Sequence, residues 1–218
     1  LNNAGVTTVN QEMKNLLISN KLTDSVQVIP MGVKITEQDR PKKPKQIVFV
    51  GRIVEKKGLE FLLEAVADID CQLTVIGDGP LRAPLEKSKP ENAMFLGQRS
   101  KQEVLETIAQ SELMVIPSVV AASGDREGLP VTLMEAAANK TAVVATNMTG
   151  INDVIEDGVS GLLVSERNVS ELREAIEKLL DDDSLRAKLA KNLNKQAKQF
   201  DIEVIANRYL EVIQGVSK

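Results

Sequence analysis

The sequence predicts an α/β fold: a doubly wound domain with a six-stranded parallel sheet, followed by C-terminal helices. Short, continuously apolar runs recur along the chain, and segments with helical periodicity separate most of them. Continuous apolar strands that alternate with helices are typical of a parallel sheet covered on both faces. The expected strands are 47–50, 73–76, 93–96, 113–116, 142–146 and 161–164. The expected helices between them are 59–67, 81–87, 101–109 and 130–139.

Different segments flank this sheet. Before it lies a separate piece, with short strands expected at 6–9 and 26–29 and a helix between them at 11–19. The polar, basic stretch QDRPKKPK at 38–45 then indicates a linker. After the sheet, Asn168 with Glu171 three residues later predicts a capping box at the start of a helix. The helices expected in this last part are 169–180, 184–199 and 202–213.

Composition limits the classes of function. A hydrophobic content of 43% in 218 residues is ample for a core. A net charge of -4 and 2% aromatic residues argue against nucleic-acid binding, which needs clustered cations and stacking platforms. One cysteine, Cys71, and no His exclude an internal disulfide and a Cys/His zinc site, so a reducing, cytoplasmic setting is expected. Because the chain does not begin with Met, we expect a piece of a longer protein.

The segment DREGLPVTLME at 125–135 places two glutamates, Glu127 and Glu135, around a Gly-Leu-Pro turn. Pro130 suits the first turn of a helix, so Glu127 lies on a loop and Glu135 within the helix. We expect Glu135 to lie away from the apolar face of that helix and to look back toward the loop. Carboxylates beside free helix N–H groups suit a ligand with an anionic group and hydroxyls, such as a sugar nucleotide. The alternative is a solvated Glu on a loop and a polar-face Glu on an ordinary helix.

Ligands of doubly wound folds bind at the carboxyl edge of the strands, so the residues that follow strands are the candidates. Arg52 and Lys57 follow the first strand and could flank a diphosphate, supplying positive charge that other sites take from a metal ion. The alternative is a pair of solvated loop cations that pair with Glu55. The other turns expected on this edge are 77–80, 97–98, 117–135 and 146–150.

Other motifs in the sequence do not indicate a metal site, a dinucleotide or Walker-type site, or a serine nucleophile. Asp68-Ile69-Asp70 matches a metal-binding pattern, but it precedes a strand and so falls on the wrong edge of the sheet. No Gly-x-Gly-x-x-Gly follows the first strand, and no Walker loop is present. Ser118 and Ser123 have no His that could activate them as nucleophiles.

Several motifs together resemble a known family. Taken in order, FVGRIVEKKGLEFLLEAV, LTVIGDGPLRAPLE, FLGQRSKQEVLETIAQSELMVIPS and GDREGLPVTLMEAAA are similar to the C-terminal half of family 4 retaining glycosyltransferases. These enzymes have the GT-B fold, in which two Rossmann-like domains face each other. The insert PSVVAASGDREG resembles bacterial members that build exopolysaccharides, such as colanic acid and amylovoran transferases.

The resemblance also implies the domain organisation. Residues 1–34 are similar to the end of the N-terminal acceptor domain and its crossover, and 35–46 form a linker. Residues 47–199 form the nucleotide-sugar donor domain, and 200–218 a helix that crosses back to the acceptor domain. Without that domain, the face of the last helix that carries Ile205, Tyr209 and Ile213 is expected to be exposed or to pair with another chain.

Residue roles follow from the resemblance. Arg52 and Lys57 would bind the donor diphosphate and neutralise the leaving group, and Glu127 would hold hydroxyls of the sugar; these three are the implied catalytic residues. Glu135 would bind the ribose. The other implied donor-binding positions are Gly51, Gly77, Asp78, Gly79, Pro80, Leu96, Gly97, Gly128, Leu129 and Pro130.

The implied reaction moves a sugar, with retention, from a nucleoside diphosphate sugar to a hydroxyl of a saccharide or lipid-linked acceptor, in cell-surface polysaccharide biosynthesis. No essential metal and no cofactor are implied. The enzyme would be cytoplasmic, and the resemblance allows peripheral association of the full-length enzyme with the inner face of the membrane. We expect the present chain to be inactive without its acceptor domain.

Two other functions stay open. The chain could be a noncatalytic nucleotide-sugar-binding subunit that pairs with a separate acceptor-domain chain. A GT-B sugar-nucleotide epimerase is disfavoured by the absence of His.

Some positions depart from the family pattern. Lys140 stands where a helix-ending Gly is usual, so either Asn139 takes the left-handed conformation or the turn differs. Thr149 replaces the first Gly of a Gly-Gly turn, and Asn152-Asp153 replaces Pro-Glu.

Overall fold

The computed structural model describes residues 6–34, 36–38 and 40–216. Residues 1–5, 35, 39 and 217–218, which belong to the expected opening segment, linker and last helix, lie outside the described residues. The chain forms two compact units. One comprises residues 36–196; the other comprises residues 1–35 together with 197–218.

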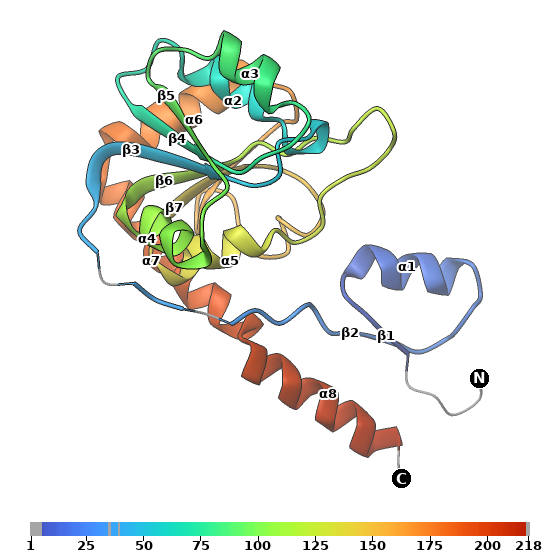
Figure 1. Cartoon of the computed structure of the whole chain (residues 1–218). Helices are drawn as coiled ribbons and strands as arrows, with labels where there is room; N and C mark the ends of the chain where they lie inside the picture. The colour runs from blue at the N-terminus through green and yellow to red at the C-terminus, as the bar shows by residue number, and fades with distance from the viewer. Residues whose placement is uncertain (1–5, 35, 39, 217–218) are drawn as a thin grey trace. The chain divides into compact units, whose positions relative to one another are not determined.

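The larger unit contains one six-stranded sheet with the order β5-β4-β3-β6-β7-β8 (Figure 1). Every pair of neighbouring strands is parallel. This arrangement confirms the predicted fold class. The strands are β3 (Lys43–Val50), β4 (Gln72–Ile76), β5 (Ala93–Gly97), β6 (Ser111–Ile116), β7 (Ala142–Thr146) and β8 (Leu162–Val164).

Helices cover both faces of this sheet (Figure 1). One face carries α2 (Leu59–Val66), α3 (Arg82–Ser88) and α6 (Val169–Asp181). The other carries α4 (Lys101–Gln110) and α5 (Val131–Ala138), and α7 (Asp183–Ala197) follows α6 along the chain. Two covered faces explain why the strands are continuously apolar rather than alternating.

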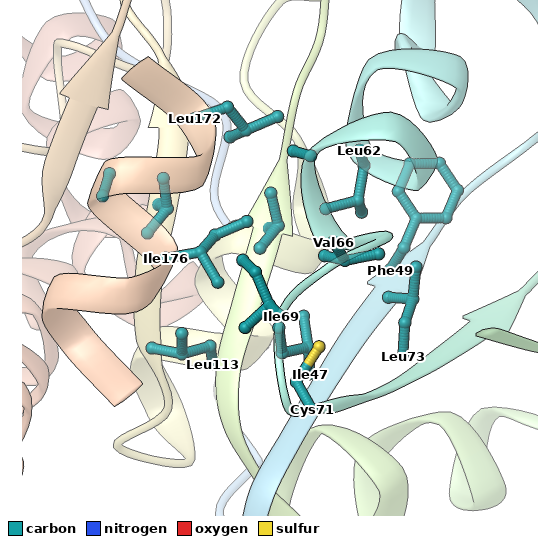
Figure 2. Packing of buried hydrophobic residues seen from close by; sticks show 14 of the residues in the cluster. Ile47, Phe49, Leu62, Val66, Ile69, Cys71, Leu73, Leu113, Leu172 and Ile176 are labelled. Carbon is teal, nitrogen blue, oxygen red and sulfur yellow. The ribbon is translucent and has the colours of Figure 1, made fainter. Parts of the chain in front are cut away.

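The main core lies between the sheet and the pair α2 and α6 (Figure 2). Ile47 and Phe49 of β3 point to this face, while Val48 between them is buried on the opposite face. Leu62 from α2 and Ile176 from α6 both point into this core, and both are completely buried. Each such side chain stabilises the fold by about 1.5–3 kcal/mol.

Strand β3 begins at Lys43, four residues before the expected strand, and so extends into the stretch we expected to be linker. Lys43 pairs with Ser111 of β6, and the backbone N–H of Lys45 donates to the Glu112 carboxylate at 2.7 Å. Nearby, Lys42 Nζ donates to Thr141 Oγ1 at 2.7 Å. These polar contacts order a segment whose composition alone indicates a linker.

Helix ends differ from expectation in two places. Asn168 accepts a hydrogen bond from Glu171 N, but the Glu171 carboxylate accepts from Ser165 N, so the expected capping box at α6 is only half formed. At the end of α5, Lys140 itself takes the left-handed conformation with φ +49°, and Asn139 does not (φ -92°). The Asn139 side chain donates instead to Glu135 O at 2.8 Å.

The smaller unit contains a two-stranded parallel sheet of β1 (Val6–Thr8) and β2 (Val26–Val28). Helix α1 (Gln11–Ser19) connects the two strands, and a 3₁₀ turn (Lys198–Phe200) precedes α8 (Ile202–Val216). Ile205 is buried beside Gly32, whereas Ile213 is 60% exposed. The apolar face expected on the last helix is therefore covered at its start and exposed further along. No described helix is long and apolar enough to span a bilayer.

The buried thiol of Cys71 should be almost unreactive in the folded protein. Burial raises the pKa of Cys71 to about 11, and the neighbouring Asp70 charge adds to the shift. Because the thiolate is the nucleophile, we expect reaction with a disulfide reagent at pH 8 to be roughly 100-fold slower in the native chain than in denaturant. The comparison of the two rates measures this. Equal rates would show that Cys71 is accessible.

Candidate functional site

The strand order reverses between the adjacent strands β3 and β6, and the loops that follow these strands lie side by side. Gly58, at the end of the β3 loop, has φ +61°, and a Cβ there would lie 1.9 Å from Pro117 O at the start of the β6 loop. Only glycine fits such a contact. In doubly wound folds, ligands bind at the carboxyl ends of the strands where the strand order reverses.

The floor of the site is built by close backbone contacts between the β3 and β4 loops. A Cβ on Gly77 would lie 1.8 Å from Gly51 O, and a Cβ on Gly79 2.3 Å from Ile53 O. Hydrogen bonds fix the same contact, since Ile53 N donates to Asp78 O at 2.8 Å. The GDGP turn at 77–80 thus packs against the loop that follows β3, at the carboxyl edge of the sheet where we expected it.

A cleft of about 680 Å³ opens above this floor. Arg52 and Asp78 line it, and so do the three glycines predicted for the site, Gly51, Gly77 and Gly79. The other predicted positions do not line it: Lys57, Pro80, Leu96, Gly97, Glu127, Gly128, Leu129, Pro130 and Glu135. Gly97 O nevertheless accepts a hydrogen bond from Gly77 N at 2.9 Å. Residues that sequence reasoning did not name also line the cleft: Val50, Ile76, Arg99 and Val104, with Gln98 of the expected third turn.

The Arg52 side chain is exposed at the cleft and makes no ion pair or hydrogen bond with any residue in the described ranges. The alternative in which Glu55 pairs with the loop cations is not observed for it. Glu55 instead accepts a hydrogen bond from Ala122 N at 2.9 Å and lies 3.9 Å from Arg167. The Arg52 guanidinium is therefore free to bind an anion.

Lys57 and Glu127 form an ion pair across the two loops. Their side chains are only 17% and 15% exposed, so neither is a solvated loop charge. The Lys57 side chain also passes over Gly51, where an added Cβ would lie 3.4 Å from Lys57 Cε. The structure thus brings together the cation and the carboxylate that the sequence placed on separate loops.

Glu135 lies in α5, and its side chain is 9% exposed. The alternative of a polar-face glutamate on an ordinary helix is not observed, because every residue of α5 from Leu133 to Ala138 is buried. Lys101 at the start of α4 forms an ion pair with it. A nearly buried carboxylate needs such a partner, because desolvation without one is costly.

The start of α5 offers backbone groups without a side-chain cap. Pro130 is the N-cap residue and provides no side-chain cap, so N–H groups of the first turn can bind another partner. Gly150, with φ +91°, brings the β7 loop against this turn: a Cβ there would lie 2.7 Å from the carbonyl carbon of Gly128. In that loop, where the family pattern is broken, Asn152 Nδ2 donates to Asn147 Oδ1 at 3.1 Å. Leu129, between Gly128 and Pro130, is half-buried.

The Asp68-Ile69-Asp70 pattern lies at the opposite edge of the sheet, as expected. Asp68 pairs with Arg173 and Asp70 with Lys45.

Comparison with known proteins decides the family. Residues 33–200 match the family described as glycosyl transferases group 1. The chain belongs to this family. The matched range includes every loop of the site described above, and Glu127 and Glu135 both lie in it.

Curated relatives are identical to this chain at about a third of the aligned positions. An alpha-D-kanosaminyltransferase of Streptomyces kanamyceticus is 34% identical over 67% of the chain, which covers 39% of the relative. The putative colanic acid biosynthesis glycosyltransferase WcaL of Escherichia coli is 31% identical over 88% of the chain and 52% of the relative. The chain thus spans about half the length, or less, of these relatives.

Solved structures share the fold at lower identity. HepE of Anabaena, in complex with UDP, superposes with a TM-score of 0.84 at 20% identity, covering 97% of this chain and 64% of that one. Sucrose-phosphate synthase of Thermosynechococcus elongatus superposes with a TM-score of 0.82 at 22% identity, covering 97% and 58%. These likenesses support one half of a GT-B fold.

Proposed function

We propose that the chain is the donor-binding half of a family 4 retaining glycosyltransferase. The full enzyme would move a sugar from a nucleoside diphosphate sugar to an acceptor hydroxyl in polysaccharide biosynthesis. The observation that carries this proposal is the Lys57–Glu127 ion pair, since Lys57 lies over Gly51 at the edge of the cleft that Arg52 lines, where the strand order reverses. Two cations and a carboxylate in and next to one cleft match a ligand with a diphosphate and a sugar.

Each group would have a distinct task. Arg52 and Lys57 bind the diphosphate and neutralise the charge that develops when it leaves, so the donor site needs no resident metal or cofactor. Glu127, released from Lys57, accepts hydrogen bonds from sugar hydroxyls. Glu135 accepts hydrogen bonds from the ribose hydroxyls, which replace its ion pair with Lys101. N–H groups at the start of α5 add donors for the phosphates.

Retention would follow from a front-face reaction. The acceptor oxygen attacks the anomeric carbon on the face from which the diphosphate departs. As the bond from carbon to the diphosphate oxygen breaks, that oxygen takes the acceptor proton. This route requires no protein base.

The acceptor half would supply the acceptor site and exclude water when the two halves close. WcaL is named for colanic acid biosynthesis, and another relative, from Campylobacter jejuni, for transfer to a diphospho-undecaprenol saccharide. By analogy we propose a saccharide or lipid-linked acceptor and a cytoplasmic enzyme at the inner face of the membrane.

Titration with UDP, GDP and ADP tests the donor site. We expect at least one to bind with an affinity between millimolar and micromolar, about -4 to -8 kcal/mol, by NMR or thermal shift. The matched control is Arg173→Ala, which removes an arginine from the opposite edge of the sheet and should leave binding unchanged. No response to any of the three nucleotides in the wild-type chain would refute the donor site.

The same preparation, mixed with nucleotide sugars and an acceptor extract, should show no efficient transfer. Efficient transfer would contradict the requirement for an acceptor half. A noncatalytic subunit remains the second candidate, favoured by the exposed apolar side chain of Leu210 on α8. Transfer restored by an acceptor half encoded in the same reading frame would exclude it.

A further inference from the structure

The loop from Pro117 to Pro130, which carries Glu127, is hydrogen-bonded to the β8 loop at Val120. Val120 N–H donates to Glu166 Oε2 at 2.8 Å, and Val120 O accepts from Arg167 Nη2 at 2.6 Å. Both backbone groups of one exposed residue are thus bound by adjacent charged side chains. Hydrogen bonds to charged groups are the stronger ones in proteins.

The 3₁₀ turn Glu55–Lys57 binds the same loop from another side. Val119 N donates to Lys56 O at 2.9 Å, and Ala122 N donates to the Glu55 carboxylate at 2.9 Å. Lys56 Nζ lies 3.1 Å from the Asp125 carboxylate. Because Lys57 belongs to this turn, the loop that carries Glu127 is fixed to the segment that carries its ion-pair partner.

Arg167 connects the two sets of contacts. Its guanidinium lies 5.7 Å from the centre of the Phe61 ring and 3.9 Å from Glu55. Its backbone has φ +59°, a conformation that residues other than glycine adopt rarely and that surrounding contacts must maintain. One side chain therefore bridges the β8 loop, the 3₁₀ turn and Val120.

Between Ala122 and Arg126 the loop is exposed, so apolar packing does not fix its path there. Polar contacts at Val119, Val120, Ala122 and Asp125 do so, just before Glu127. A shift of about 1 Å in such a loop is enough to misplace a binding group.

We propose that Glu55, Lys56, Glu166 and Arg167 form a loop clamp that positions Glu127 for the sugar of the donor. The clamp residues are positioning residues, since they act through the loop. The proposal rests on the proposed function. It predicts that loss of the clamp weakens recognition of the sugar and spares recognition of the nucleoside diphosphate, because neither Arg52 nor Lys57 is one of the four clamp residues.

The test compares UDP with UDP-glucose, and GDP with GDP-mannose, on the wild-type chain and on Arg167→Ala. We expect the Kd for the free nucleotide to change less than twofold. The ratio of the Kd for the nucleotide sugar to that for the free nucleotide should rise fivefold or more. Arg167→Lys, which keeps the cation near Phe61, should restore part of the ratio. Hydrogen exchange at Val120 and Ala122 should become faster in Arg167→Ala.

Arg173→Ala is the matched control, because Arg173 also bonds a carboxylate and a carbonyl oxygen, those of Asp68 and Glu64, but at the opposite edge. It should leave the ratio unchanged. If Arg167→Ala does not fold, Glu166→Gln removes one clamp charge at constant size and should raise the same ratio. Absence of binding by the wild-type chain would overturn the proposed function and the clamp with it. Wild-type binding with an unchanged ratio in the folded variant would overturn the clamp alone.

Discussion

Replacing Lys57 with Ala should weaken binding of the nucleoside diphosphate by about 2 to 5 kcal/mol in the desolvated site of the full-length enzyme. The loss should be smaller in the open 218-residue chain. The ammonium is mostly buried beside Gly51 and Glu127, so its charge is poorly screened and its removal also leaves a carboxylate to repel the diphosphate. Isothermal titration with the nucleotide that the wild-type chain binds measures the change.

The double variant Lys57→Ala/Glu127→Gln separates the two causes. It removes the unpaired carboxylate, so it should recover thermal stability and only the repulsive part of the lost affinity. Arg52→Ala should weaken binding without a loss of stability, since the Arg52 side chain has no partner in the described part of the chain. Unchanged affinity in both Lys57→Ala and Arg52→Ala would contradict the assignment of the diphosphate to this loop.

Replacing Gly77 with Ala should lower the free energy of unfolding by about 2 to 5 kcal/mol, because strain and overpacking combine there. Gly77 has φ +141°, and the added Cβ would lie 1.8 Å from Gly51 O, a backbone atom that cannot move without β3. Denaturant unfolding measures the loss. The cleft should also lose affinity for nucleotides, because Gly51 and Gly77 both line it.

Gly124→Ala is the matched control for this prediction. Gly124 also has a positive φ of +81°, but no atom lies within 4 Å of the added Cβ. We expect a cost of about 1 to 2 kcal/mol from the left-handed backbone alone. Equal losses in the two variants would mean that the contact between the β3 and β4 loops contributes nothing beyond backbone strain.

Periodicity predicted the sheet well because its strands are buried on both faces. The runs from Ile47 and Leu113, for example, lie in β3 and β6, which are adjacent at the centre. The start of β3 at Lys43 escaped prediction because contacts with Ser111 and Glu112, distant in sequence, order that segment. The local sequence around Lys43 contains no information about these distant partners.

The sequence predicted at which edge of the sheet the site lies, but it did not predict which side chains form ion pairs there. Strand direction placed Arg52, Lys57 and Glu127 together, since every strand of a parallel sheet ends at the same edge. The burial of Glu135 was missed because its helix is covered on all sides, which its sequence does not distinguish from a helix with one polar face. Lys101 follows β5 at the same edge, and that position was the only signal that could have indicated it.

The Lys57–Glu127 pair also bears on how the spent nucleotide leaves. In the proposed function, the diphosphate of the bound donor would hold the Lys57 ammonium and the sugar would occupy the Glu127 carboxylate. After transfer of the sugar, the carboxylate would be vacant and would compete with the diphosphate for Lys57, as in the ion pair observed here. This internal competitor would lower the affinity of the product relative to that of the donor. Product release limits the turnover of many enzymes, and here the protein would supply its own displacing anion.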